Sequence, residues 1–241
     1  MKGRRIQLEQ FFDLEEQNTI RADCMSLVAN LDDNDEAEQL SVAGDVESII
    51  TTLCKRLQVA YSSENGWIEI IATLMNLKMS KEETYACLEV IVKKFIPRST
   101  CNDQAFHLLR LLVLYHDPEL CSFLDSKKVH PEQYTGSWFR SLFASQSSFE
   151  VTQAIWDTYF VIGDPFHVFF VALVILINSR EQILEMSACE REDIVTAISS
   201  IPKALQVEDV ADLFTLVETH YRSHTPDVSV RDASLPPSLE C

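Results

Sequence analysis

The stretch GDVESIITTLCKRLQ, residues 44–58, carries the strongest periodic signal in the chain. Its apolar residues recur at alternating intervals of three and one, at Val46, Ile49, Ile50, Leu53, Cys54 and Leu57. In an α-helix this spacing places all of them on one stripe, which must be covered by other elements. We therefore predict a core helix over these residues.

The same pattern continues toward the C-terminus. Similar stripes run from Trp67 to Leu77 and from Tyr85 to Phe95, and Ser80 with Glu83 has the spacing of a capping box. Further helices are predicted over 106–115, 118–124, 131–143, 149–161, 165–177, 191–199 and 207–221, three of which begin at a proline, a residue that suits the first helical turn. No strand-like alternation competes, so we expect an all-α, multi-helix fold.

Composition limits the function. The 241 residues include 37 Asp and Glu against 20 Lys and Arg, a formal net charge of −17, and 46% are hydrophobic. A chain this apolar can fill a core, which excludes collagen-like, low-complexity and wholly disordered classes. The acidic excess argues against binding of nucleic acid or anionic membranes, because phosphate groups would repel it. We expect partners to bind through local patches.

Neither a membrane span nor a disulfide framework is predicted. The longest apolar run, Phe166 to Ile177, is shorter than the roughly 20 residues a spanning helix needs. The N-terminal residues are basic without a following apolar stretch, so we expect no secretory signal and a cytosolic chain. The seven cysteines form no CxxC pair and are odd in number, and we expect them to remain thiols in the core.

Two stretches lack helical periodicity. Five acids fall between residues 32 and 38, at Asp32, Asp33, Asp35, Glu36 and Glu38, and their mutual repulsion predicts a solvated acidic loop. Residues 224–241 contain three prolines and no period, which predicts a disordered tail or a truncated linker.

Familiar enzyme signatures are missing from the sequence. It has no nucleophile elbow, no glycine-rich phosphate loop and no HExxH motif. Among the six histidines only His220 and His224 stand at i, i+4, and they lack a third ligand. We therefore expect neither a metal nor a cofactor.

A block of motifs carries a family resemblance: YHDPEL at 115–120, Tyr134, Trp138, IWD at 155–157 and DPF at 164–166. In identity and spacing it resembles the TBC domain, the all-helical domain of Rab GTPase-activating proteins. The resemblance runs from about Phe11 to Tyr221 and implies a TBC domain over residues 1–223. Family members begin with a further helical stretch bearing an arginine and an aromatic residue, which we do not find before Phe11, so the domain is expected to lack its first helices.

The resemblance also implies two catalytic positions. Active members supply an arginine from an IxxDxxR motif, which neutralises charge on the γ-phosphate, and a glutamine from a YxQ motif, which positions the attacking water. Here the first motif contains Ile20 and Asp23 but ends in Ser26, and the second places Glu69 where the glutamine belongs. An arginine finger is worth about 10³ to 10⁵ in rate, and a negative carboxylate would oppose the transition state. We expect no GTPase-activating activity.

Neither nearby residue is expected to replace the missing arginine. Arg21 lies five positions before Ser26, which is about 140° away around a helix. Asp23 is retained, but the role of a helix-surface acid or a cap accounts for it.

Basic residues are scarce and fall in two clusters. These are Lys93, Lys94 and Arg98 at one helix end, and Lys127 and Lys128 after another. Cations at a helix C-terminus are stabilised by the macrodipole, so a structural role accounts for them. They are also the candidates for docking an acidic peptide.

Within the TBC family, the stretches EQNTIRADC, YHDPELCSFLD and EVTQAIWD resemble a branch that acts in vesicle tethering. The resemblance implies a catalytically inactive adaptor that binds golgin tethers at the cytoplasmic face of the trans-Golgi network, in endosome-to-Golgi transport. Two alternatives stay open: an effector that binds a Rab without speeding hydrolysis, and a residual activator with catalytic groups from elsewhere.

Overall fold

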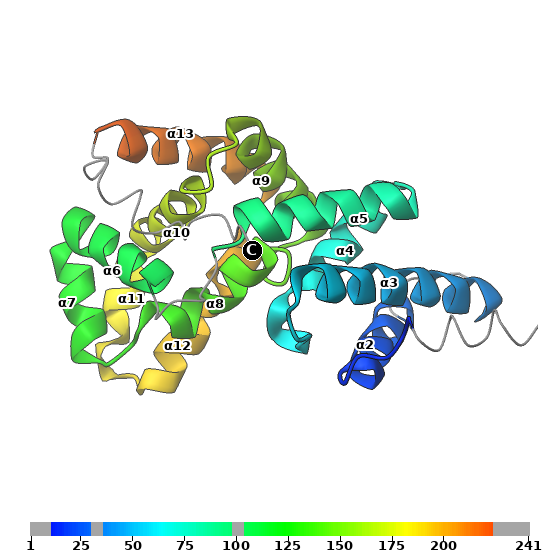
Figure 1. The fold of residues 1–241 in the computed structure, drawn as a ribbon. Helices are drawn as coiled ribbons and strands as arrows, with labels where there is room; N and C mark the ends of the chain where they lie inside the picture. The colour runs from blue at the N-terminus through cyan, green and yellow to red at the C-terminus, as the bar shows by residue number, and fades with distance from the viewer. Residues whose placement is uncertain (1–10, 30–35, 98–103, 224–241) are drawn as a thin grey trace, which may run out of the picture. The chain divides into compact units, whose positions relative to one another are not determined.

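A computed structural model describes residues 11–29, 36–97 and 104–223. Every regular element in these ranges is helical, as the sequence predicts (Figure 1). The chain divides into two compact units, Met1–Lys94 (unit 1) and Phe95–Cys241 (unit 2). Each unit has its own buried core and is described separately.

Unit 1 is built on the helix that the opening stretch predicts. Its elements are α2 (Gln17–Ala29), α3 (Glu36–Leu57), η1 (Ser63–Asn65), α4 (Trp67–Met75), α5 (Lys81–Val90) and the π-helical η2 (Ile91–Phe95), which ends at the border with unit 2. Helix α2 packs along α3, and α5 contacts both α3 and α4. The apolar stripe lies in the core, where Ile50 and Leu53 are fully buried, as are Ile20 of α2 and Ile71 of α4.

Local signals set the helix ends in unit 1. Ser80 and Glu83 form the predicted capping box, in which the Ser80 Oγ accepts from the Glu83 amide (3.3 Å) and the Glu83 carboxylate accepts from the Ser80 amide (2.8 Å). These hydrogen bonds lower the pKa of Glu83. Gly66 joins η1 to α4 with φ of 73°, a left-handed conformation that favours glycine. The start of α4, which carries Glu69, is fixed in this way.

Unit 2 packs around one apolar helix. It contains α6 (Gln104–His116), α7 (Pro118–Ser126), α8 (Pro131–Ser141), α9 (Phe149–Ile162), α10 (His167–Asn178), α11 (Arg180–Glu185), η3 (Met186–Ala188), α12 (Arg191–Ser200), η4 (Ile201–Ala204) and α13 (Val207–Ser223). Every residue of α10 from His167 to Leu176 is buried, because α6 and α13 pack against it. A helix that is apolar on all sides is expected at the centre of a domain.

The motifs that carry the family resemblance hold unit 2 together. Asp117 caps α7 by accepting from the Leu120 amide (2.9 Å), and its second oxygen accepts from the Arg180 Nε (2.7 Å) at the start of α11. The Trp138 indole donates to the Ser199 carbonyl of α12 (3.0 Å). The contacts with Arg180 and Ser199 join elements that are more than 60 positions apart in the sequence.

Several predicted boundaries need correction. Helix α10 begins at His167 and not at 165, because Pro165 lies in the turn that Asp164 stabilises by accepting from the Phe166 amide. Helix α8 ends at Ser141, where Leu142 takes a positive φ. Glu36 and Glu38, expected in the acidic loop, lie in the first turn of α3, where acids are favoured by the helix dipole. Residues 32–35 and the tail 224–241 lie outside the described residues.

The structure also shows how long the apolar helices are and where the cysteine thiols lie. No single helix in the described ranges is long and apolar enough to cross a bilayer; α10 and the following segment to Ala188, bent by 60°, pass such a test only as a pair. Cys24, Cys54 and Cys121 are buried free thiols, as predicted, and Cys87 and Cys189 are half-buried. Burial raises the pKa of Cys24 to about 12 and that of Cys54 to about 11.

Candidate functional site

The two positions where the resemblance places the catalytic fingers lie on helices of unit 1 that pack against each other. Ser26 is exposed near the end of α2, and Glu69 is half-buried in the first turn of α4. The Glu69 Oε2 is buried, and no described residue donates a hydrogen bond to it. A buried acceptor without a donor costs about 1–3 kcal/mol of folding free energy. Glu69 therefore lowers the stability of unit 1 taken by itself. We call the surface formed by Ser26, Glu69 and Asp23 the finger edge.

Asp23 has a structural role at the finger edge. Its Oδ2 accepts from the Tyr61 hydroxyl (2.8 Å) and from the Ser63 Oγ (2.6 Å). These bonds tie α2 to the segment that leads into α4. Burial and the Asp23 carboxylate raise the pKa of Tyr61 well above its usual range. The retained acid of the IxxDxxR motif therefore positions a loop, a role that goes beyond the expected surface acid or cap.

Arg21 faces α3 and is held there. Its Nη2 lies 2.9 Å from the Glu47 Oε1, and that oxygen also accepts from the Gln17 Nε2 (2.8 Å), which in turn contacts Thr51. Gln17, Glu47 and Thr51 are buried, so the pair is part of a polar network between α2 and α3. The structure agrees with the helical-wheel argument that Arg21 is poorly placed to replace a cation at Ser26.

Other cations of unit 1 are also engaged by acids. Lys55 pairs with Asp13, Lys81 with Asp45, and both Arg56 and Lys93 with Glu89. Acids, by contrast, gather close to the finger edge, where Glu64 of η1 is exposed and Asp23 and Glu69 are half-buried. Such an arrangement favours contact with cations or hydrogen-bond donors and disfavours an incoming phosphate.

The predicted basic candidates fall in different units. Lys93 and Lys94 are exposed on η2, at the end of unit 1, and Lys93 bonds to Glu89 (2.5 Å). Lys127 follows α7 in unit 2, where its ammonium donates to the carbonyls of Ser187 and Cys189. Lys128 is exposed. Arg98 lies outside the described residues. Lys127 thus links two segments of unit 2, and Lys94 and Lys128 are the candidates most accessible to a partner.

No cluster of three or more metal-ligating side chains occurs within the described ranges. His224, one half of the only predicted i, i+4 pair, lies outside those ranges. His220 instead contacts His116 of α6, with 3.1 Å between the two Nδ1 atoms. This contact links α13 to α6 and could not be anticipated from residues 104 positions apart.

Sequence reasoning missed the partners of the finger-edge residues. Tyr61 and Ser63 are 38 and 40 positions from Asp23, and Glu47 is 26 positions from Arg21. One signal was available for the second set: Gln17 and Arg21 stand at i, i+4, as do Glu47 and Thr51, so two helices each present a pair of polar groups on one face.

Comparison with known proteins agrees with this architecture. A family model described as the Rab-GTPase-TBC domain matches residues 4–184. TBC1 domain family member 4 of Mus musculus is 29% identical over 158 residues, which are 62% of this chain and 12% of that protein. The TBC domain-containing protein kinase-like protein of Dictyostelium discoideum is 30% identical over 138 residues, 55% of this chain and 13% of that protein. The chain thus spans about an eighth of the length of these relatives.

A solved structure shares the fold. The crystal structure of the Chlamydomonas flagellar RabGAP TBC domain superposes with a TM-score of 0.70, covering 90% of this chain and 72% of that one, at 16% sequence identity. At this identity the likeness concerns the fold alone. The family model covers more than half of the chain, from before α2 through α11. The chain therefore belongs to the Rab-GTPase-TBC domain family.

Proposed function

We propose that this TBC domain does not accelerate GTP hydrolysis and serves as a protein-binding module. The observation that carries the proposal is the finger edge: a serine and a glutamate occupy the positions where active relatives are expected to carry arginine and glutamine. Glu69 would place negative charge beside a transition state that is itself negative. Arg21 supports the proposal because it is engaged by the Glu47 carboxylate on α3.

The partners and cellular setting are proposed from the resemblance. From the stretches quoted above, we propose a relation to member 23 of the TBC domain family, whose TBC domain is expected to hold golgin tethers at the trans-Golgi network. An acidic golgin segment would meet a chain of net charge −17, so it can bind only where lysines reverse the local field. The exposed Lys94 and Lys128 are our candidates for that contact.

A hydrolysis assay tests the loss of activity. The chain is incubated with a panel of GTP-loaded Rab proteins, with the Chlamydomonas flagellar RabGAP TBC domain as a comparison. We expect no stimulation by this chain. Stimulation of about tenfold for any Rab, far below the 10³ to 10⁵ of a full arginine finger, would already contradict the proposal. A companion variant, Ser26→Arg with Glu69→Gln, tests whether the two positions are what limits activity.

A binding assay separates the adaptor from a Rab effector. Immobilised chain is offered golgin segments and, separately, GTP-loaded Rab proteins. Golgin binding that weakens as salt rises from about 50 to 500 mM, which shortens the screening length from about 14 to 4 Å, supports the adaptor. Charge reversal by Lys94→Glu with Lys128→Glu should weaken it further. Nucleotide-dependent Rab binding with no golgin binding would favour the effector instead.

A further inference from the structure

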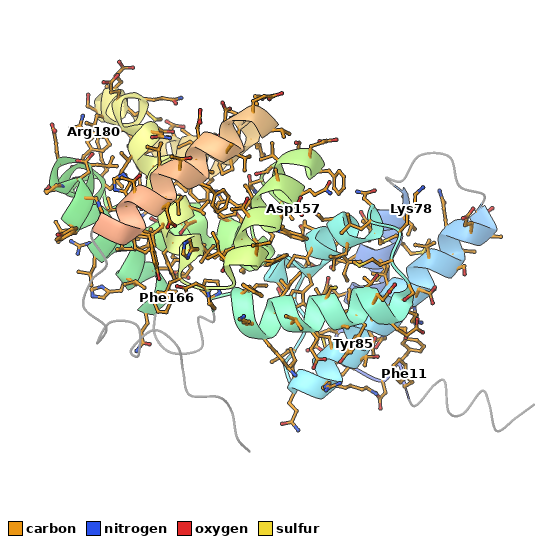
Figure 2. All side chains as sticks on the ribbon, turned by 90° about the horizontal axis from the view of Figure 1, so that it is seen from above. Phe11, Lys78, Tyr85, Asp157, Phe166 and Arg180 are labelled. Carbon is orange, nitrogen blue, oxygen red and sulfur yellow. The ribbon has the colours of Figure 1, made fainter. Side chains whose placement is uncertain are left out.

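A groove opens in unit 2 between three helices, and its lining includes neither a finger-edge residue nor a lysine proposed for golgin binding. It encloses about 430 Å³ and is lined by α9, α10 and α13. Figure 2 shows α13 (orange) beside α9 (yellow-green), which carries the labelled Asp157. The apolar wall of the groove comes from Ile162 of α9 and from Ala211, Phe214 and Val217 of α13. A concave, partly apolar surface of this size accommodates one or two side chains of a partner.

The hydroxyl groups in the groove can only accept hydrogen bonds. Thr215 and Thr219 donate to the carbonyls four residues earlier in α13, at 3.0 and 2.9 Å. Thr158 does the same in α9, at 3.4 Å. A hydroxyl has one proton, so each oxygen offers only its lone pairs to an occupant. The groove therefore favours a ligand that brings donors.

One acidic side chain lines the groove, and further exposed acids lie on the helices that form it. Glu218 belongs to the lining, with 42% of its side chain exposed, and Asp157 precedes the lining residue Thr158 and is exposed. Glu208 and Asp212 are exposed on α13, within four residues of Ala211. None of the nine lining residues is lysine or arginine. The local field thus has the sign of the whole chain and attracts cations.

The floor of the groove is already ordered. His167 is buried, and its two ring nitrogens lie 3.9 Å from the Asp164 Oδ2 and 4.0 Å from the Glu218 Oε2. Its ring lies beside that of Tyr221, with 4.4 Å between the centroids and 31° between the planes, and the Tyr221 hydroxyl donates to the same Asp164 oxygen at 2.7 Å. A site held by such contacts needs little rearrangement to accept a ligand, which favours binding.

We propose that this groove docks a basic, amphipathic segment of a partner protein. Aliphatic side chains of the segment pack on Phe214 and Ile162, while an arginine or lysine reaches the threonine oxygens and Glu218. An acidic peptide or a nucleic acid would meet both the wrong charge and a lining without cations. The site is independent of the lysines proposed for golgin binding, so the two surfaces can fail separately.

The probe is a fluorescent helical peptide with leucine and arginine along one face, and its control carries citrulline in place of every arginine. Citrulline keeps the size of arginine and removes its charge. Fluorescence anisotropy is measured with the full chain. With each partly exposed charge pair worth about two- to fivefold in affinity, we expect the arginine peptide to bind at least about tenfold more tightly.

Two variants locate the site. Ala211 is exposed, so Ala211→Arg introduces a cation and bulk into the groove without disturbing the core, and it should abolish binding. Glu218→Gln should weaken binding about two- to fivefold. Glu150→Gln, at the exposed start of α9 outside the lining, is the matched control and should have no effect.

A photo-crosslinker on the peptide gives an independent readout, and we expect its products in residues 158–162 and 207–219. Equal affinity of the two peptides, full binding by a folded Ala211→Arg chain, or crosslinks confined to other segments would each overturn the proposal.

Discussion

The finger edge of unit 1 and the motif residues of unit 2 show how family membership and activity separate. In unit 2, Asp117, Trp138 and Asp164 form the contacts expected of a scaffold, and they are the residues that make the family recognisable. In unit 1, the positions expected to carry chemistry hold Ser26 and Glu69. A scaffold contact is needed for the stability of the whole unit, whereas a finger residue is needed for catalysis and not for the fold. Family membership inferred from scaffold residues is therefore no evidence that a chain retains GTPase-activating activity.

The largest effect should come from the scaffold itself. Trp138 is fully buried, so Trp138→Ala removes a large side chain and the indole hydrogen bond to Ser199. We expect a loss of about 3–5 kcal/mol in the free energy of unfolding, measured by urea denaturation. Trp138→Phe keeps much of the ring and should cost less. Equal and small losses for both variants would mean that this contact does not hold α8 to α12.

The polar network of unit 1 should give the next largest effect. Glu47→Ala removes the carboxylate that accepts from both Gln17 and Arg21, leaves the Gln17 amide with the Thr51 hydroxyl alone as acceptor, and should cost about 1–3 kcal/mol in urea denaturation. Asp45→Ala is the control on the same helix, because it removes an acid that is 55% exposed and paired with Lys81, a pair worth about 0–1 kcal/mol. If both variants lose the same free energy of unfolding, burial does not make the Glu47 network more important than the exposed Asp45–Lys81 pair.

Asp23 should affect the stability of the folded chain through its hydrogen bond with Tyr61. The pKa of Tyr61 in the folded chain is raised by burial and then by the bond to Asp23, so its neutral form contributes stability that is complete below the unfolded pKa of about 10 and lost as pH rises through the folded pKa. Asp23→Asn should lower that pKa and cost about 1 kcal/mol at neutral pH.

Tyrosinate absorbance during an alkaline titration measures the change, and subtraction of the Tyr61→Phe titration isolates this group. An unchanged Tyr61 titration in Asp23→Asn would show that burial alone sets its pKa.

The smallest effect is expected for a surface pair of unit 2. Arg110 of α6 donates to both carboxylate oxygens of Asp125 on α7 and lowers the pKa of that carboxyl. The resulting stability is present above the unfolded pKa of about 3.9 and is lost as pH falls through the lower, folded pKa. Asp125 is partly exposed, so Asp125→Asn should cost only about 0.2–1 kcal/mol at pH 7. The difference in free energy of unfolding between Asp125→Asn and the parent chain should vanish when the pH falls below the folded pKa of Asp125. A difference that stays constant at all pH values would point to another cause.

Helices were predictable here because their signals are local. The stripe of 44–58 and the Ser80–Glu83 capping box lie within one element, and both appear in the structure. Helix α11 was not predicted because six residues are too few for a periodic signal. The start of α10 was placed two residues early because a proline can precede a helix as well as open it.

The site was less predictable because its contacts are long-range. The resemblance identified Ser26 and Glu69, but the role of Asp23 depends on Tyr61 and that of Arg21 on Glu47, which only tertiary packing brings near. The groove of unit 2 joins helices that begin at 149, 167 and 207, and no single stretch of sequence contains it. The carbonyl partners of Lys127, about 60 positions away, are likewise not visible from the sequence, so its link between two segments of unit 2 could not be predicted.

The buried thiols give each unit its own reporter of opening. Cys24 and Cys54 lie in unit 1 and Cys121 in unit 2, and burial raises the pKa of all three, so a labelling reagent reaches them as thiolates only when the surrounding helices separate. Pulsed alkylation resolved by mass spectrometry would therefore time the opening of the two units separately on one unmodified chain. It would tell whether the region that holds the scaffold and the region that holds the finger edge unfold together or in turn.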